Sequence, residues 1–215
     1  MKPHQTAFLE LALEHEVLKF GRFTLKSGRI SPYFFNLGKI ASGAGLRRLA
    51  GAYADALLGS GVEFDLLFGP AYKGIPLVAA IAYALAERGR DLPFAYNRKE
   101  AKDHGEGGVL VGAPVVGARV VIVDDVLTAG TALRQSHALL RDAGATTVAA
   151  MTALDRQEVG PNGRSAVQEL ASEAGIAVLP LVTVRDLLAH LTQSGGDAAT
   201  IDAINAYQAQ YGVKD

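Results

Sequence analysis

The sequence contains no cysteine and almost no net charge, and both absences exclude whole classes of function. The chain has 215 residues and a formal net charge of -1. No global attraction therefore draws it to nucleic acid or to an anionic membrane. Without cysteine there is no disulfide framework, no thiolate zinc site and no cysteine nucleophile. An anionic ligand must be held by local charges instead.

The chain also lacks the apolar segments that export and membrane insertion require. Residues 1–10 show no basic segment followed by an apolar run, so we expect no signal peptide. No apolar stretch approaches the roughly 18 residues that a membrane helix needs. We therefore expect a soluble cytoplasmic protein, with a core large enough to need neither disulfides nor a structural metal.

Short apolar runs alternate with longer helical patterns, which predicts βαβ units around a parallel sheet. The runs are apolar on successive residues, as in strands that are covered on both faces. We predict strands at residues 64–68, 92–96, 120–123, 148–154 and 178–184, and helices at 75–88, 131–143 and 165–174.

The two ends of the chain follow other patterns, which predict an α/β core with a small cap. The expected elements of the first 60 residues are helices at 8–18 and 45–58 and a hairpin formed by residues 23–25 and 33–37. We assign residues 1–60 to an N-terminal cap, 61–193 to the core, and 194–215 to a C-terminal segment whose helix, at 200–211, packs on the core or the cap.

The predicted strand at 120–123 runs directly into two carboxylates, Asp124 and Asp125. In parallel sheets, ligands bind at the carboxyl ends of strands. The loop that follows contains Thr128 and Gly130 and enters a helix, whose N-terminal N–H groups suit a phosphate. The carboxylates suit the hydroxyls of a sugar. This pattern predicts a ribose 5-phosphate site, with a solvated strand end or a metal site as the alternatives.

A second loop, GPAYKGI at residues 69–75, joins the predicted strand at 64–68 to a helix. Gly69 and Gly74 permit backbone angles that are closed to other residues, and Lys73 adds a cation. The string is not a P-loop, because G-x-x-x-x-G-K-[ST] is absent. Taken alone, an ordinary turn with an exposed lysine explains it equally well. Beside the aspartate loop, it indicates a second anion site.

Residues 97–109 are rich in charge and glycine. Few apolar side chains anchor this segment, so we predict a mobile loop that could close over a ligand as a lid. If the ligand is a ribose phosphate that loses pyrophosphate from C1, cations in this loop would stabilise the negative charge that builds up on the leaving group. His104 could also bind or protonate that group, because histidine changes its charge near neutral pH. The alternative is a solvated surface loop.

Several strings together resemble the orotate phosphoribosyltransferases of the type I phosphoribosyltransferase family, along nearly the whole chain. VDDVLTAGT at 123–131 matches the motif that binds phosphoribosyl pyrophosphate (PRPP) in all type I enzymes. More particular to the orotate enzymes are FGRFTLKSG at 20–28, SPYFFN at 31–36 and NRKEAKDHGEGG at 97–108. GPAYKGI at 69–75 and ALDR at 153–156 complete the match.

The resemblance implies a fold and a reaction. The fold is a Rossmann-like parallel sheet flanked by helices, with a small N-terminal hood. The reaction is the Mg²⁺-dependent transfer of ribose 5-phosphate from PRPP to orotate, which yields orotidine 5′-monophosphate and pyrophosphate in de novo pyrimidine biosynthesis. Mg²⁺ would be held mainly by PRPP and water, so we name no direct metal ligand. The resemblance also implies a homodimer with shared active sites.

Residue roles follow from the same resemblance. The GPAYKGI loop would bind pyrophosphate, with a strained backbone near Ala71 and Tyr72 that a non-proline cis peptide could provide. The residues implied in PRPP binding are Lys26, Tyr72, Lys73, Arg98, Lys99, Lys102, His104, Asp124, Asp125, Val126, Leu127, Thr128, Ala129, Gly130, Thr131 and Ala132. The catalytic subset comprises Lys73, Arg98, Lys102, His104, Asp124 and Asp125. Orotate would contact Lys26, Phe34, Phe35, Thr128 and Arg156, with Arg156 pairing bidentately with its carboxylate.

Alternatives exist for both the residues and the function. Phe34 and Phe35 could simply be core of the cap, and Arg156 a surface residue. The enzyme could use another base, such as a purine or uracil, although Arg156 and the SPYFF string argue against that. A PRPP-binding regulator without catalysis usually needs a nucleic-acid-binding module, and no basic module is visible.

Overall fold

We describe the chain from a computed structural model, which covers residues 1–25, 27–102, 108–127, 130–160 and 162–214, without the side chains of residues 101 and 102. Its centre is a six-stranded sheet with the spatial order β5-β4-β3-β6-β7-β8. The parallel strands are β3 (Leu66–Gly69), β4 (Phe94–Lys102), β6 (Arg119–Val123), β7 (Thr146–Asp155) and β8 (Ala177–Thr183). Each overlaps a strand that the sequence predicts.

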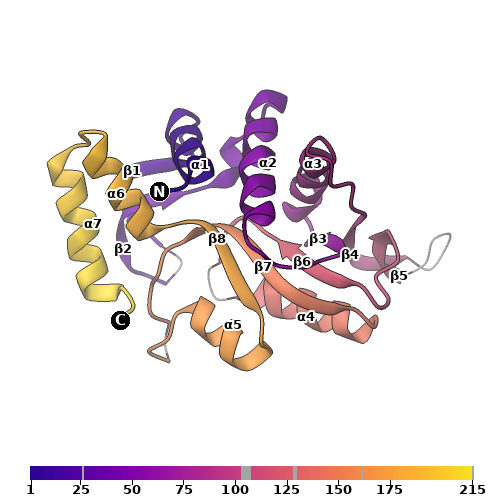
Figure 1. The fold of residues 1–215 in the computed structure, drawn as a ribbon. Helices are drawn as coiled ribbons and strands as arrows, with labels where there is room; N and C mark the ends of the chain where they lie inside the picture. The colour runs from indigo at the N-terminus through magenta and orange to yellow at the C-terminus, as the bar shows by residue number, and fades with distance from the viewer. Residues whose placement is uncertain (26, 103–107, 128–129, 161, 215) are drawn as a thin grey trace.

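Helices cover both faces of this sheet, as Figure 1 shows. On one face lie α2 (Gly43–Leu58) and α3 (Gly74–Ala86); on the other lie α4 (Thr131–Asp142) and α5 (Ala166–Ala174). The side chains of β6 alternate between the two cores. Val121 and Val123 belong to the core with α2 and α3, whereas Val120 and Ile122 belong to the core with α4 and α5. This two-sided burial explains the unbroken apolar run in the sequence.

The two ends of the chain gather beside β8 (Figure 1). They comprise α1 (Pro3–Glu14), the antiparallel pair β1 (Leu18–Thr24) and β2 (Ile30–Phe35), a short 3-10 helix at Leu37–Lys39, α6 (Val184–Gln193) and α7 (Ala198–Tyr211). Tyr33 of β2 meets Tyr207 of α7 edge to face, with 6.4 Å between ring centroids. The C-terminal helix therefore packs on the N-terminal hairpin.

Several predicted boundaries are wrong. The helix expected at 8–18 begins at Pro3 and ends at Glu14, because Glu16 turns the chain with a positive φ of 53° and Leu18 opens β1. Helix α6 is absent from the prediction. The segment expected as a loop at 97–109 is strand at both ends, since β4 reaches Lys102 and β5 (Gly108–Gly112) pairs antiparallel with it. Residues 103–107, the centre of the predicted lid, lie outside the described residues.

The division of the chain at residue 60 stays a prediction. Helix α2 belongs to the segment assigned to the cap, yet it packs against α3 and shares one hydrophobic core with it. Among the described residues, no helix has the length and apolar character needed to cross a membrane.

We expect Ile81→Ala to lower the free energy of unfolding by about 2–5 kcal/mol, because the side chain of Ile81 in α3 is fully buried and its loss leaves a cavity. Tyr83→Ala, two residues along the same helix, is the matched control. Its side chain is 64% exposed, so its effect should stay within about 0.5 kcal/mol. Urea unfolding measures both. Equal effects would contradict the packing of α3 on the sheet.

Candidate active site

The loop after β6 is anchored to the neighbouring strand through its backbone. The Asp124 N–H donates to the carbonyl of Met151 at 2.9 Å, and the Ala153 N–H donates to the carbonyl of Asp125 at 3.0 Å. From α2, the hydroxyl of the fully buried Tyr53 donates to the Asp124 carbonyl at 2.9 Å. The two aspartates therefore stand at a rigid position at the carboxyl edge of the sheet.

The Asp124 carboxyl group has an altered protonation equilibrium. Burial raises its pKa to about 6, and the neighbouring Asp125 carboxylate adds repulsion, although a hydrogen bond from the Asp125 backbone N–H lowers the pKa. Removal from water disfavours the charged form of an acid. Asp124 therefore changes its charge close to neutral pH.

Asp125 joins the aspartate loop to the GPAYKGI loop. Its Oδ2 atom accepts a hydrogen bond from the Lys73 Nζ at 2.6 Å, and its Oδ1 atom accepts one from the Val126 N–H at 2.8 Å. The Lys73 side chain is 60% exposed and that of Asp125 is 16% exposed. Because the lysine stays largely in water, the pair is weak, and a ligand can draw Lys73 away.

The GPAYKGI loop closes tightly on itself. A Cβ atom on Gly69 would lie 2.1 Å from the carbonyl oxygen of Gly74, and one on Gly74 would lie 2.7 Å from the backbone of Gly69. Both positions therefore require glycine. The peptide bond between Ala71 and Tyr72 is cis, which confirms the expectation drawn from the resemblance.

Two residues of β4 border the same loop. The Asn97 side-chain oxygen accepts a hydrogen bond from the Ala71 N–H at 3.0 Å. The Lys99 ammonium lies 4.6 Å from the centre of the Tyr72 ring, whose side chain is 66% exposed. The structure thus brings Tyr72, Lys73 and Lys99 together at one edge of the sheet, and Arg98 lies next to Lys99 in β4.

Helix α4 begins at Thr131 and is preceded by Gly130 in a left-handed conformation, with φ of 71°. Glycine has no side chain that could cap the helix. Among the described residues, no side chain caps the first turn, so its N–H groups can serve an acceptor, and the helix dipole favours an anion there. Of the other residues implied in phosphate binding, Val126 forms a bridge with Leu154, and Ala132 lies in the first turn of α4.

The residues implied in orotate binding lie on the hairpin and after β7. Phe34 is 42% exposed and packs against Phe23, with 5.5 Å between ring centroids, whereas Phe35 faces the core near Phe8. Neighbouring residues of a strand point to opposite faces. Only Phe34 therefore presents its ring outward, and the Phe35 ring packs partly buried against the core. That Phe34 and Phe35 contact orotate stays a prediction.

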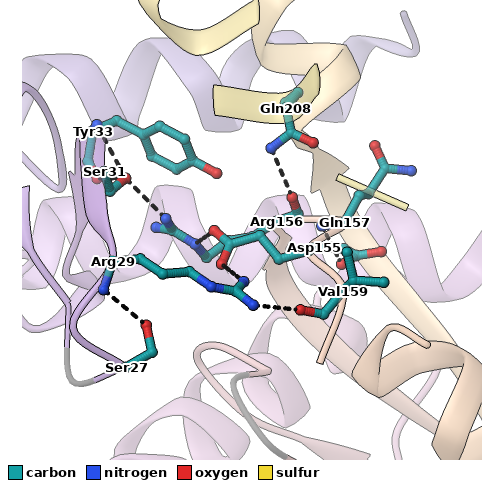
Figure 2. A network of polar contacts seen from close by, with 10 residues as sticks. Ser27, Arg29, Ser31, Tyr33, Asp155, Arg156, Gln157, Val159 and Gln208 are labelled. Atoms are coloured by element: carbon teal, nitrogen blue, oxygen red, sulfur yellow. Dashed lines mark hydrogen bonds and ion pairs between the residues drawn. The ribbon is translucent and has the colours of Figure 1, made fainter. Parts of the chain in front are cut away.

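Arg156 follows β7 and is almost enclosed, with a side chain only 12% exposed. Its Nε donates to the Glu158 carboxylate at 2.6 Å. Its Nη2 donates to the Ser31 hydroxyl at 2.9 Å, as drawn in Figure 2. The guanidinium also lies over the Tyr33 ring, 4.3 Å from its centre. The surface interpretation of Arg156 is therefore wrong.

Some implied residues lie outside the described part of the chain. These are Lys26, His104, Thr128 and Ala129. Lys102 belongs to β4, but its side chain is not described. Within the described residues, no group of three or more histidine or acidic side chains could hold a metal ion.

Sequence reasoning misses three residues that shape this region. Tyr53 supports Asp124 from α2, Asn97 holds the Ala71 N–H, and Glu158 pairs with Arg156. No sequence signal distinguishes Tyr53, because its position fits the apolar face of an amphipathic helix like those of its buried neighbours. Asn97 and Glu158 lie within or close to strings that the resemblance uses.

Comparison with known proteins assigns the family. The profile of the phosphoribosyl transferase domain matches residues 39–174. An orotate phosphoribosyltransferase of Xanthomonas campestris pv. campestris is 56% identical over 214 residues, which cover 99% of this chain and 98% of the relative. The chain belongs to the orotate phosphoribosyltransferase family. A second family member, from Thioalkalivibrio sulfidiphilus, is 57% identical over 99% of this chain and 100% of its own length.

A solved structure agrees with the family and the fold. The crystal structure of the orotate phosphoribosyltransferase of Francisella tularensis has a TM-score of 0.87 and 43% sequence identity, and it covers 95% of this chain and 98% of its own. The predicted α/β fold, a parallel sheet flanked by helices, is therefore confirmed as the type I phosphoribosyltransferase fold.

We expect Asp124 to make a contribution to the stability of the protein that changes between pH 4.5 and 7.5. Its folded pKa of about 6 exceeds the ordinary aspartate value of 3.8, which we take for the unfolded chain. The contribution is therefore fully present below pH 3.8 and is lost as the pH rises through 6. The contribution of Asp124 changes by about 2 kcal/mol between pH 4.5 and pH 7.5.

The measurement compares the urea unfolding free energies of wild type and Asp124→Asn at both pH values. The unfolding free energy of the variant minus that of wild type should be about 2 kcal/mol larger at pH 7.5 than at pH 4.5. Asp65→Asn is the control, because a hydrogen bond from Arg119 lowers the pKa of Asp65 to about 2, outside this window. A parallel pH response of Asp124→Asn and wild type would refute the buried state of Asp124.

Proposed function

We propose that this protein transfers the ribose 5-phosphate of PRPP to orotate, releasing pyrophosphate and forming orotidine 5′-monophosphate. The reaction supplies a step of de novo pyrimidine biosynthesis. The observation that carries the proposal is the pair Asp124 and Asp125 at the carboxyl end of β6, in the loop that leads to the N-terminus of α4, which the N-cap residue Gly130 does not cap with a side chain. Carboxylates for a diol and N–H donors for a phosphate thus stand side by side, as a ribose phosphate requires.

In this proposal each loop binds one part of PRPP. The 2′- and 3′-hydroxyls donate to the two aspartates, and the 5′-phosphate accepts from the first turn of α4. The pyrophosphate lies against the GPAYKGI loop, where Lys73 exchanges Asp125 for a pyrophosphate oxygen. The weak, exposed ion pair between Lys73 and Asp125 supports this exchange. Arg98, Lys99 and Lys102 of β4 add positive charge beside the leaving group.

The chemistry then needs no covalent intermediate with the enzyme. The orotate ring nitrogen forms a bond to C1 of the ribose as the bond from C1 to the pyrophosphate oxygen breaks, with inversion at C1. Negative charge builds up on the departing pyrophosphate, and the cations stabilise it. Lys102 and His104, which we place in the lid, would add further positive charge beside the pyrophosphate. The closed lid would also exclude water from the oxocarbenium-like ribose.

Orotate is held by its carboxylate and by its flat ring. Arg156 supplies the charge, and the exposed ring of Phe34 borders the hairpin side. The contacts of Arg156 already occupy Nε and an Nη2 hydrogen. The bidentate pairing that the sequence predicts must therefore use another edge of the guanidinium, or else Ser31 must release it.

Mg²⁺ fits this site as a companion of the substrate. The described residues provide two adjacent carboxylates, one of them paired with Lys73, and no cage of three or more ligands. Mg²⁺ prefers to keep phosphate and water ligands, so PRPP would carry it, with Asp124 and Asp125 as the available protein carboxylates. When bound, the ion neutralises charge on the pyrophosphate.

An orotate-depletion assay tests the proposal. Purified protein with PRPP and Mg²⁺ should consume orotate, as read by its ultraviolet absorbance. Turnover with hypoxanthine, adenine or uracil should be at least about 100-fold slower, because only orotate carries a carboxylate for Arg156. Turnover of uracil at the rate of orotate would support the competing assignment to another base.

We also propose that the active enzyme is a homodimer in which Lys102 of one subunit completes the site of its partner. Lys102→Ala should lower turnover at least about 100-fold while PRPP still binds. A mixture of Lys102→Ala with Asp124→Asn/Asp125→Asn subunits should regain about a quarter of wild-type activity, since half the dimers carry one intact site. No recovery after subunit exchange would show that each site is built by a single chain.

A further inference from the structure

Glu158 lies between two arginines that come from distant parts of the chain. Its carboxylate accepts hydrogen bonds from Arg156 Nε at 2.6 Å and from Arg29 Nη1 at 3.3 Å. Arg156 follows β7, and Arg29 immediately precedes β2. The side chains are 12% exposed for Arg156, 17% for Glu158 and 26% for Arg29. This cluster is more enclosed than the surface pair of Arg119 and Asp65, whose side chains are 46% and 47% exposed.

Glu158 is the charged member of the set that orients Arg156. The Tyr33 ring, 4.3 Å from the guanidinium carbon, limits its tilt, while Ser31 and Glu158 accept from two of its nitrogens. Ser31 and Tyr33 are both fully buried. Charge-assisted hydrogen bonds are the stronger and more directional ones, so Glu158 determines the rotation of the guanidinium within its plane.

The backbone between Arg156 and Glu158 is held in a conformation that few residues adopt. Gln157 has a φ of 50°, in the left-handed region. Its N–H donates to Asp155 Oδ1 at 2.8 Å, and its carbonyl accepts from the Val213 N–H at 2.8 Å. Such backbone persists only where the surroundings over-determine it. The backbone conformation of Gln157 and its two hydrogen bonds therefore fix the position of Glu158 relative to Arg156.

The C-terminal helix reinforces the same segment. Gln208 of α7 donates to the Arg156 carbonyl at 3.2 Å, and the Val159 N–H donates to the Tyr211 carbonyl at 2.8 Å. Arg29 lies over the Tyr211 ring, 4.8 Å from its centre, and its Nη2 donates to the Val159 carbonyl at 2.9 Å. Figure 2 shows Arg29 and Arg156 between the hairpin and the segment that Gln208 contacts.

We infer that Glu158 is a positioning residue for base recognition, which sets the edge of the Arg156 guanidinium that receives the orotate carboxylate. This inference rests on the proposed role of Arg156. An enclosed ion pair costs desolvation that its attraction barely repays, so stability alone is a poor reason for this arrangement. A guanidinium held in a fixed orientation offers the orotate carboxylate a receptor that needs no reorganisation.

The test is steady-state kinetics of the full chain with Glu158→Gln. An amide offers one oxygen and no charge to two arginines, so Arg156 should lose its fixed orientation. We expect the KM for orotate to rise about 10-fold or more, with kcat and the KM for PRPP within about twofold of wild type. In the reverse reaction the KM for orotidine 5′-monophosphate should rise likewise, and that for pyrophosphate should not.

Two further variants separate the possible failures. Arg156→Lys tests the proposed function: if the KM for orotate stays unchanged in it, the role of Arg156 is wrong. If Arg156→Lys raises that KM and Glu158→Gln leaves it unchanged or lowers it, only the positioning role is wrong. Glu158→Asp keeps the charge but withdraws it by one methylene, so it should shift the KM in the same direction and serves alone if Glu158→Gln does not fold.

Asp65→Asn is the control for loss of an ion pair as such. Arg119 opens β6 and Asp65 immediately precedes β3, so this pair lies at the amino ends of the two strands, opposite the carboxyl ends that carry the loops proposed to bind substrate. Both KM values should stay at wild-type levels in this variant. An equal rise in the KM values for PRPP and orotate in Glu158→Gln would mark a merely structural role and overturn the inference.

Discussion

The position of the two aspartates depends on one constraint, the burial of β6 on both faces. Its side chains alternate between two hydrophobic cores, so the strand can neither shift nor rotate without opening one of them. The backbone hydrogen bonds of Asp124 and Asp125 to β7 extend this order beyond the end of the strand. Carboxylates that would be costly to bury elsewhere are thus held at the rim, where one of them responds to pH near neutrality.

A second consequence of the same sheet order is the meeting of loops that are distant in sequence. Because β3 and β6 are neighbours, Lys73 after β3 reaches Asp125 after β6 at 2.6 Å. Because β4 lies on the other side of β3, Asn97 supports the Ala71 N–H. Strand adjacency therefore assembles the cation and the carboxylates that we propose for pyrophosphate and ribose, and no single loop carries the whole candidate site.

The sequence predicts those parts that depend on local pattern. The apolar runs locate the five parallel strands, and VDDVLTAGT places the aspartates at a strand end. The start of helix α6 escapes prediction because Val184 extends the apolar run of β8 past the single polar residue Thr183, although Thr183 and Asp186 form a capping box there. The surroundings of Arg156 escape it because Ser31 lies 125 residues away in sequence, and only the folded chain brings the two together.

The division of labour between the shared domain and its flanks has an evolutionary consequence. The phosphoribosyl transferase profile ends at residue 174 and begins at 39, yet Arg29, Tyr33 and Gln208 that surround Arg156 lie beyond these limits. Sequence changes in the flanks can therefore alter the surroundings of Arg156, the proposed receptor for the base, while the aspartate loop stays unchanged. New base preferences could therefore arise in this fold by exchange of its terminal segments, while the loops proposed to bind the sugar phosphate stay unchanged.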